Sequence, residues 1–170
     1  DLPVLSDTNT IKNYYNYSYY FDIFEKNVST ISFFLSTVNS LSDNDVKLSE
    51  RINIPSSKLR GFEAGRVGPK DGDDFIGGNF AYTVNFSTTI PQIFEESQNV
   101  DFLFFIDTAN IFGVDYDSSL NDNGKIRSST GIALDWFSPI GPMNFSLSHP
   151  ITKKTTDKTE SFRFNLGTTF

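Results

Sequence analysis

The chain has 170 residues, enough for one domain, and a mean hydropathy of −0.28. Its longest apolar run, Phe102 to Ile106, is far shorter than the roughly 18 apolar residues of a membrane-spanning helix, so a helical membrane protein is excluded. The net charge of −7 argues against nucleic acid as a partner, and the absence of cysteine excludes disulfides and thiolate metal sites.

Apolar and polar residues alternate along most of the chain, which is typical of strands with one apolar and one polar face. The pattern predicts seven strands, in chain order near residues 10–23, 28–39, 78–90, 99–112, 125–138, 142–151 and 160–170. The last strand is the clearest, because Phe162, Phe164, Leu166 and Phe170 alternate with polar residues. Each predicted strand is about long enough to cross a bilayer at a tilt.

The predicted connections differ in length. Residues 24–27 and the Pro/Gly segment 138–142 form tight turns, whereas 40–77, 113–124 and 152–159 are longer. Outer-membrane barrels have short periplasmic turns and longer outer loops, so we place the three longer connections outside. A loop as long as 40–77 is expected to be functional or disordered.

Two all-β architectures alternate in this way, a transmembrane barrel and a soluble β-sandwich that acts as a binding module. Aromatic residues make up 15% of the chain, with 18 Phe and 7 Tyr, and they crowd the apolar faces. Phe21, Trp136 and Phe170 would also lie at one membrane rim, as an aromatic girdle requires. We therefore favour an antiparallel transmembrane β-barrel portion and keep the sandwich as the alternative.

Three strings of the sequence resemble one known family. The first is Leu59-Arg60-Gly61-Phe62 inside the long connection, the second runs from Ile126 to Pro142, and the third is the closing strand through Phe170. In this order and spacing they resemble the BamA family of outer-membrane β-barrel assembly factors, within the bacterial surface antigen superfamily.

The resemblance implies a sixteen-stranded barrel in the bacterial outer membrane, with periplasmic POTRA domains further upstream. Residues 1–170 would be the C-terminal part of that barrel, and 40–77 a loop in its lumen. Seven strands alone would leave unpaired edges in lipid, so we expect a piece of a longer chain. The implied protein is not an enzyme and uses no cofactor. It inserts and folds β-barrel proteins, and its partners are outer-membrane lipids, unfolded client proteins and lipoproteins of the assembly complex. A secretion or translocation barrel of the same superfamily is the alternative.

The resemblance also implies a loop latch made by Arg60, Gly61, Phe62 and Asp107. A guanidinium can hold a carboxylate through two parallel hydrogen bonds, and glycine allows a positive φ or a close backbone approach. In the family the arginine meets acidic groups on two strands. The position of the first falls near Ser87, which carries no charge, so we expect a weaker latch or help from Asp101 or Asp135.

A second implied site is the lateral seam and terminal signal in the last strand, made by Phe162, Phe164, Leu166, Gly167 and Phe170. In the family this strand pairs weakly with the first and opens sideways. Gly167 would either supply that weakness or simply allow the strand to follow the curvature of the barrel. Four further charges face the lumen side and are expected to be mostly solvated: Asp101, Arg127, Asp135 and Arg163. The chain has one histidine, His149, so we predict no metal site.

Overall fold

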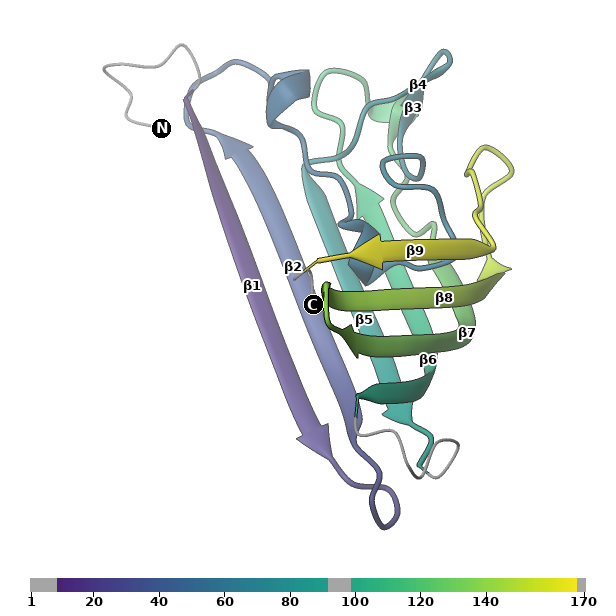
Figure 1. Cartoon of the computed structure of the whole chain (residues 1–170). Coiled ribbons are helices and arrows are strands. Elements are labelled where there is room, and N and C mark those ends of the chain that lie inside the picture. The colour runs from purple at the N-terminus through teal and green to yellow at the C-terminus, as the bar shows by residue number, and fades with distance from the viewer. Residues whose placement is uncertain (1–8, 92–98, 168–170) are drawn as a thin grey trace.

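The structure is a computed structural model that describes residues 9–91 and 99–167. One curled antiparallel sheet dominates it, with strand order β1-β2-β5-β6-β7-β8-β9 (Figure 1). The strands are β1 (Thr10–Phe21), β2 (Ser29–Ser40), β5 (Phe80–Thr89), β6 (Val100–Phe112), β7 (Arg127–Ser138), β8 (Gly141–Thr152) and β9 (Phe162–Leu166). All seven predicted strands are confirmed.

The remaining elements are short and lie in the connections. They are the hairpin of β3 (Lys70–Asp71) and β4 (Asp74–Phe75), and the 3-10 turns η1 (Leu48–Glu50), η2 (Ser56–Lys58) and η3 (Ser118–Leu120). No helix in the two described ranges has the length and hydropathy to cross a membrane.

The sheet curls so that β7, β8 and β9 stand in front of β2 and β5 (Figure 1). Every neighbouring pair is antiparallel, with Asn85 opposite Asp107 between β5 and β6. Among the described residues, the outer edges of β1 and β9 pair with no further strand. The chain therefore forms an open portion of a barrel, as predicted.

Burial along the strands is the reverse of that in a water-soluble protein. On β9 the outward side chains of Phe162 and Leu166 are 54% and 57% exposed, whereas the inward Arg163 is 8% exposed. Outward apolar residues of β7 and β8 such as Ile132 and Leu147 are exposed as well. No second large sheet covers this face in the described part of the chain, so the sandwich alternative is wrong. Lipid is the solvent that such a face requires.

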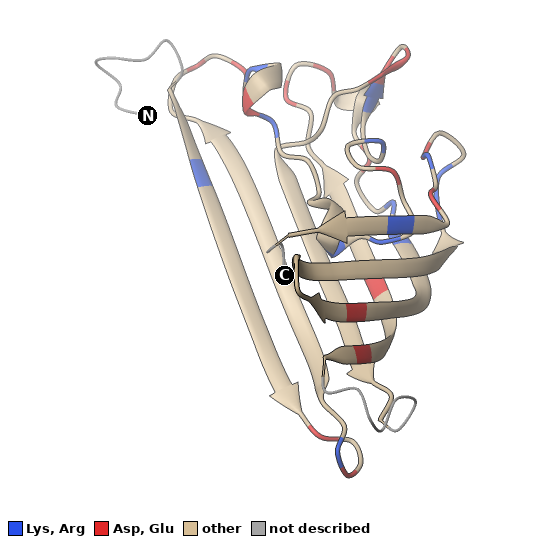
Figure 2. Cartoon of the chain, in the orientation of Figure 1, with Lys and Arg blue, Asp and Glu red and all other residues tan. Residues whose placement is uncertain are grey.

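Charged residues gather in the connections at the two ends of the strands, and few lie along the strands themselves (Figure 2). Two of the three predicted girdle residues lie at the end of the sheet that carries the short turns. Phe21 is the last residue of β1, and Trp136 lies two residues before the end of β7. Phe170 lies outside the described residues.

Candidate functional site: the Arg-Gly-Phe loop inside the sheet

The connection from β2 to β5 folds back against the inner face of the sheet. Its apolar side chains pack with inward residues of the strands into a buried cluster. The loop contributes Val46, Ile52, Ile54, Leu59, Phe62 and Val67, and the strands contribute Val38, Ala81, Ala109 and Ile111. A backbone bridge between Ile52 and Gly78 closes the base of the loop. The loop is thus held by a small core of its own inside the barrel wall.

The sequence carried one signal of this core. Strand β6 departs from clean alternation, because Phe105, Ala109 and Ile111 are apolar and yet face inward. Inward apolar residues would be costly in a water-filled lumen. Their presence indicates that something apolar covers them, and the structure shows that it is the loop.

Arg60 binds both carboxylate oxygens of Asp107. Nε donates to Oδ2 at 2.7 Å and Nη2 donates to Oδ1 at 2.8 Å, while the backbone N–H of Arg60 also donates to Oδ2 at 3.0 Å. The guanidinium lies over the ring of Phe105, with 3.5 Å from Cζ to the ring centroid. Asp107 is fully buried, so an unpaired carboxylate here would be costly.

Asp107 also accepts a hydrogen bond from a side-chain amide on the neighbouring strand. Asn85 donates through Nδ2 to Asp107 Oδ1 at 2.8 Å and to the Lys58 carbonyl oxygen at 2.7 Å. Ser87, the position at which we placed the family's first acidic group, lies two residues after Asn85 and lines a polar cavity of about 220 Å³. Asp135, one of the two carboxylates expected to help, lines the same cavity as Arg60 and accepts a hydrogen bond from Asn144, and its help to the latch stays a prediction. Asp101 is exposed on β6.

Gly61 and Phe62 follow Arg60 into tight surroundings. Gly61 has φ +86°, and a Cβ there would lie 3.0 Å from the Cβ of Ser129 and 3.2 Å from that of Ser148. The positive φ and the close approach of the neighbouring strands therefore both favour glycine at this position. Phe62 is 1% exposed, within the apolar cluster. The structure thus brings together all four predicted latch residues, and their role in function stays a prediction.

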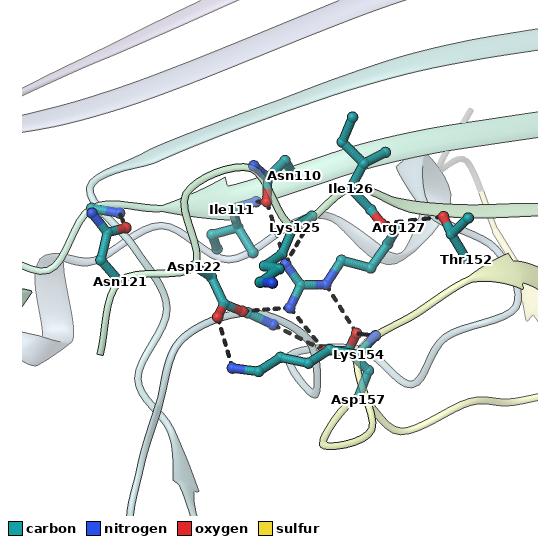
Figure 3. Close-up of polar contacts among 12 residues, drawn as sticks. Asn110, Ile111, Asn121, Asp122, Lys125, Ile126, Arg127, Thr152, Lys154 and Asp157 are labelled. Carbon is teal, nitrogen blue, oxygen red and sulfur yellow. Dashed lines mark hydrogen bonds and ion pairs between the residues drawn. The ribbon is translucent and has the colours of Figure 1, made fainter. Parts of the chain in front are cut away.

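A network of charges at the outer end of the sheet ties the loops to one another (Figure 3). Arg127, which is fully buried, donates to Asp157 Oδ2 at 2.9 Å and to Asp122 Oδ2 at 2.5 Å. Lys154 donates to Asp122 Oδ1 at 2.7 Å. Asp157 also accepts from the backbone N–H of Gly68 in the long loop, at 3.5 Å. The expectation that Arg127 is solvated is wrong, because the loops cover it.

The charges of this network perturb one another. Burial alone would raise the pKa of the Asp122 carboxyl, but hydrogen bonds from Arg127 and Lys154 outweigh burial and lower that pKa. The pKa of Asp115, a carboxyl in the connection between β6 and β7, is lowered for a similar reason. Burial would raise its pKa, yet hydrogen bonds from the Val46 N–H and the Asn79 side chain lower it. Both carboxylates are therefore well suited to act as permanent anions between loops.

The predicted seam residues lie on β9 or directly after it. Phe162, Phe164 and Leu166 face outward and are exposed, and Gly167 has φ +114° where the strand ends. The backbone N–H of Gly167 donates to the Pro142 carbonyl oxygen at 3.0 Å. Phe170 lies outside the described residues. The predicted solvation of Arg163 is wrong, because this side chain is buried against the loop.

Comparison with known proteins identifies the family. Residues 2–170 match the model of the Omp85 superfamily domain. Over 139 residues, 66% of this chain, the sequence is 32% identical to the outer membrane protein assembly factor BamA of Neisseria meningitidis serogroup B. It is also 29% identical, over 80% of this chain, to a SAM50-like protein of Schizosaccharomyces pombe.

A solved structure agrees. The crystal structure of BamA from Haemophilus ducreyi lacking POTRA domains 1–3 matches 96% of this chain and 35% of that one, with a TM-score of 0.87 and 30% identity. This chain spans 17% of the Neisseria protein and 30% of the Schizosaccharomyces protein. The bacterial relatives indicate the bacterial outer membrane as its location. The chain belongs to the Omp85 superfamily, and its seven strands are a portion of a BamA-like outer-membrane β-barrel.

Proposed function

We propose that residues 1–170 form the C-terminal part of the barrel of an outer-membrane protein assembly factor. This protein inserts and folds other β-barrel proteins in the outer membrane. The observation that carries the proposal is the lumenal loop, pinned to the barrel wall by the two-pronged ion pair of Arg60 and Asp107. Similarity to two BamA proteins that are named as outer membrane protein assembly factors supports it.

The proposed mechanism is non-enzymatic. Client strands add to the outer edge of β9 where it opens from the first strand of the barrel, by β-augmentation, in which backbone hydrogen bonds supply the affinity. The mechanism that we propose requires neither metal nor nucleotide. Its partners are outer-membrane lipids, unfolded client proteins and lipoproteins of the assembly complex.

The latch keeps the loop in place while the edge of β9 exchanges partners. Asp107 is fully buried, so releasing Arg60 would leave a carboxylate without its counter-charge, at a cost of about 3–5 kcal/mol. The apolar cluster around Phe62 adds to this hold. The loop is therefore a fixed part of the wall, against which the edge strand moves.

The test is Arg60→Ala in the full-length protein, with Arg66→Ala as the control. Arg66 is an exposed arginine of the same loop, and its guanidinium only approaches the ring of Phe75, at 5.9 Å. We expect Arg60→Ala to abolish heat-modifiable migration of the folded barrel and to reduce client insertion into lipid vesicles, and Arg66→Ala to change neither. Unchanged migration together with unchanged insertion in Arg60→Ala would refute the proposal.

A further inference from the structure

The edge strand β9 is held at one end by the Arg-Gly-Phe loop as well as by its neighbour β8. Its pairing with β8 covers only five residues, from Phe162 opposite Leu147 to Leu166 opposite Met143. Arg163, on the inward face of β9, is 8% exposed because the loop covers it. The first half of β9 therefore has a second attachment.

The guanidinium of Arg163 connects three acceptors. Nη1 donates to the Ser56 carbonyl oxygen at 2.5 Å, and Nη2 donates to the Phe62 carbonyl oxygen. Nε and Nη2 donate to Glu160 Oε2 at 2.9 and 2.7 Å. Ser56 and Phe62 flank the stretch that contains Arg60, so one side chain on the edge strand bridges both ends of the latch segment. A planar fork suits this geometry, and an ammonium group does not reproduce it.

Backbone contacts continue the attachment. Residues 62 and 159 form an isolated antiparallel bridge. On either side of it, the Glu160 N–H donates to the Gly61 carbonyl at 3.1 Å, and the Glu63 N–H donates to the Lys158 carbonyl at 3.0 Å. The segment that leads into β9 is thus paired with the loop in the manner of an additional short strand.

The second half of β9 lacks this attachment. Asn165, the next inward residue after Arg163, lines the polar cavity of about 220 Å³. Phe164 and Leu166 point outward, 47% and 57% exposed, and the strand ends at Gly167 with its positive φ. In this half, β8 is the strand that pairs with β9. The hold on the edge strand is therefore asymmetric along its length.

We propose that Arg163 is a positioning residue that clamps the first half of β9 to the Arg-Gly-Phe loop and confines opening of the edge to the residues after it. The outer edge of β9 opens from Phe164 onward, while Glu160 to Arg163 stay with the loop. The clamp also couples the latch to the edge, because the segment between Ser56 and Phe62 is held by Asp107 on one side and by Arg163 on the other. The role in edge opening rests on the proposed function, whereas the clamp itself does not.

The test is hydrogen–deuterium exchange of the full-length protein in lipid bilayers, without any client. Arg163→Gln removes the charge and the fork and leaves a shorter polar side chain. We expect exchange to rise on the order of ten-fold at residues 158–163 and 56–63, as the loss of charge-assisted hydrogen bonds implies, and to stay unchanged in β5 and β6. Arg163→Lys keeps the charge and should give a smaller rise in the same two segments.

Lys153→Gln is the matched control, since Lys153 is an exposed cation in the same connection and should leave exchange unchanged. If Arg163→Gln fails to assemble, Glu160→Gln replaces it. That variant removes the counter-charge of Arg163 and should raise exchange in the same segments by a smaller factor.

Two outcomes would overturn the clamp. One is unchanged exchange in both segments in the variant that assembles. The other is a rise along the whole of β9 with none in the loop, which would mean that Arg163 supports the strand and not its attachment to the loop. A wild-type protein that fails to insert clients would overturn the proposed function and leave the exchange result intact, so the two failures are distinguishable.

Discussion

Asn85 lies directly opposite Asp107 on the neighbouring strands β5 and β6, and its amide donates to the carboxylate that holds Arg60. The same amide donates to the carbonyl oxygen of Lys58 in the loop. A carboxylate at this position could accept from Arg60, but it could donate to neither group. With Asn85 at this position, the latch pairs one cation, Arg60, with one anion, Asp107. The Asn85 amide also donates to the loop backbone.

Replacing this amide should loosen the loop. In Asn85→Ala, the Lys58 carbonyl loses this donor and Asp107 Oδ1 keeps the one from Arg60, so the expected cost is that of one unsatisfied group, about 1–3 kcal/mol. We expect a lower urea midpoint for unfolding in lipid vesicles and faster exchange of residues 56–62. Ser87→Ala, on the same face two residues along, is the control and should change neither. Equal effects of the two substitutions would contradict the assignment of Asn85.

Gly61 should tolerate alanine worse than another loop glycine with a positive φ. Gly65 has φ +66° and open space around it, so Gly65→Ala adds only backbone strain of about 1–3 kcal/mol. Gly61→Ala adds the same kind of strain and also drives Cβ toward Ser129 and Ser148. We expect the larger fall in unfolding midpoint for Gly61→Ala. Equal falls would mean that the neighbouring strands yield and that only the backbone angle requires glycine.

Arg127 should be needed for a stable outer end of the barrel. Arg127→Gln leaves Asp122 and Asp157 buried without their shared cation, and breaking a buried pair in this way costs about 3–5 kcal/mol. Lys125→Gln removes an exposed positive charge two residues earlier and serves as the control. Unfolding by urea in lipid vesicles measures both. A similar unfolding midpoint for the two variants would contradict a structural role of the network.

The same network should weaken in acid. The pKa of Asp122 is lowered in the folded protein, so its contribution to stability is present above its unfolded pKa, about 3.9, and is lost as the pH falls through the lower folded value. Titration of aspartate carboxyl resonances by NMR, with Asp122→Asn for assignment, should place the Asp122 midpoint below 3.9. Lys154→Gln should move that midpoint upward, because it removes one of the two cations that favour the carboxylate. A midpoint that Lys154→Gln leaves unmoved would contradict this ion pair.

The strands and their faces could be predicted because a strand exposes successive side chains to opposite surroundings. The alternation of Phe162, Phe164 and Leu166 with Arg163 and Asn165 is local, and it needs no knowledge of distant residues. The pairing of Arg60 with Asp107 could be named as well, because the resemblance supplied both partners.

The tertiary structure alone decided what the inward charges touch. In the sequence, Arg127 and Arg163 occupy inward positions of the alternating pattern, as a solvated lumen charge would. In the structure, loops more than 20 residues away in the sequence cover both side chains. The choice of Asn85 over Ser87 depended on strand register, in which a shift of two residues keeps the same face. Periodicity determines which way a side chain points, whereas burial and pairing depend on what the rest of the chain brings to that face.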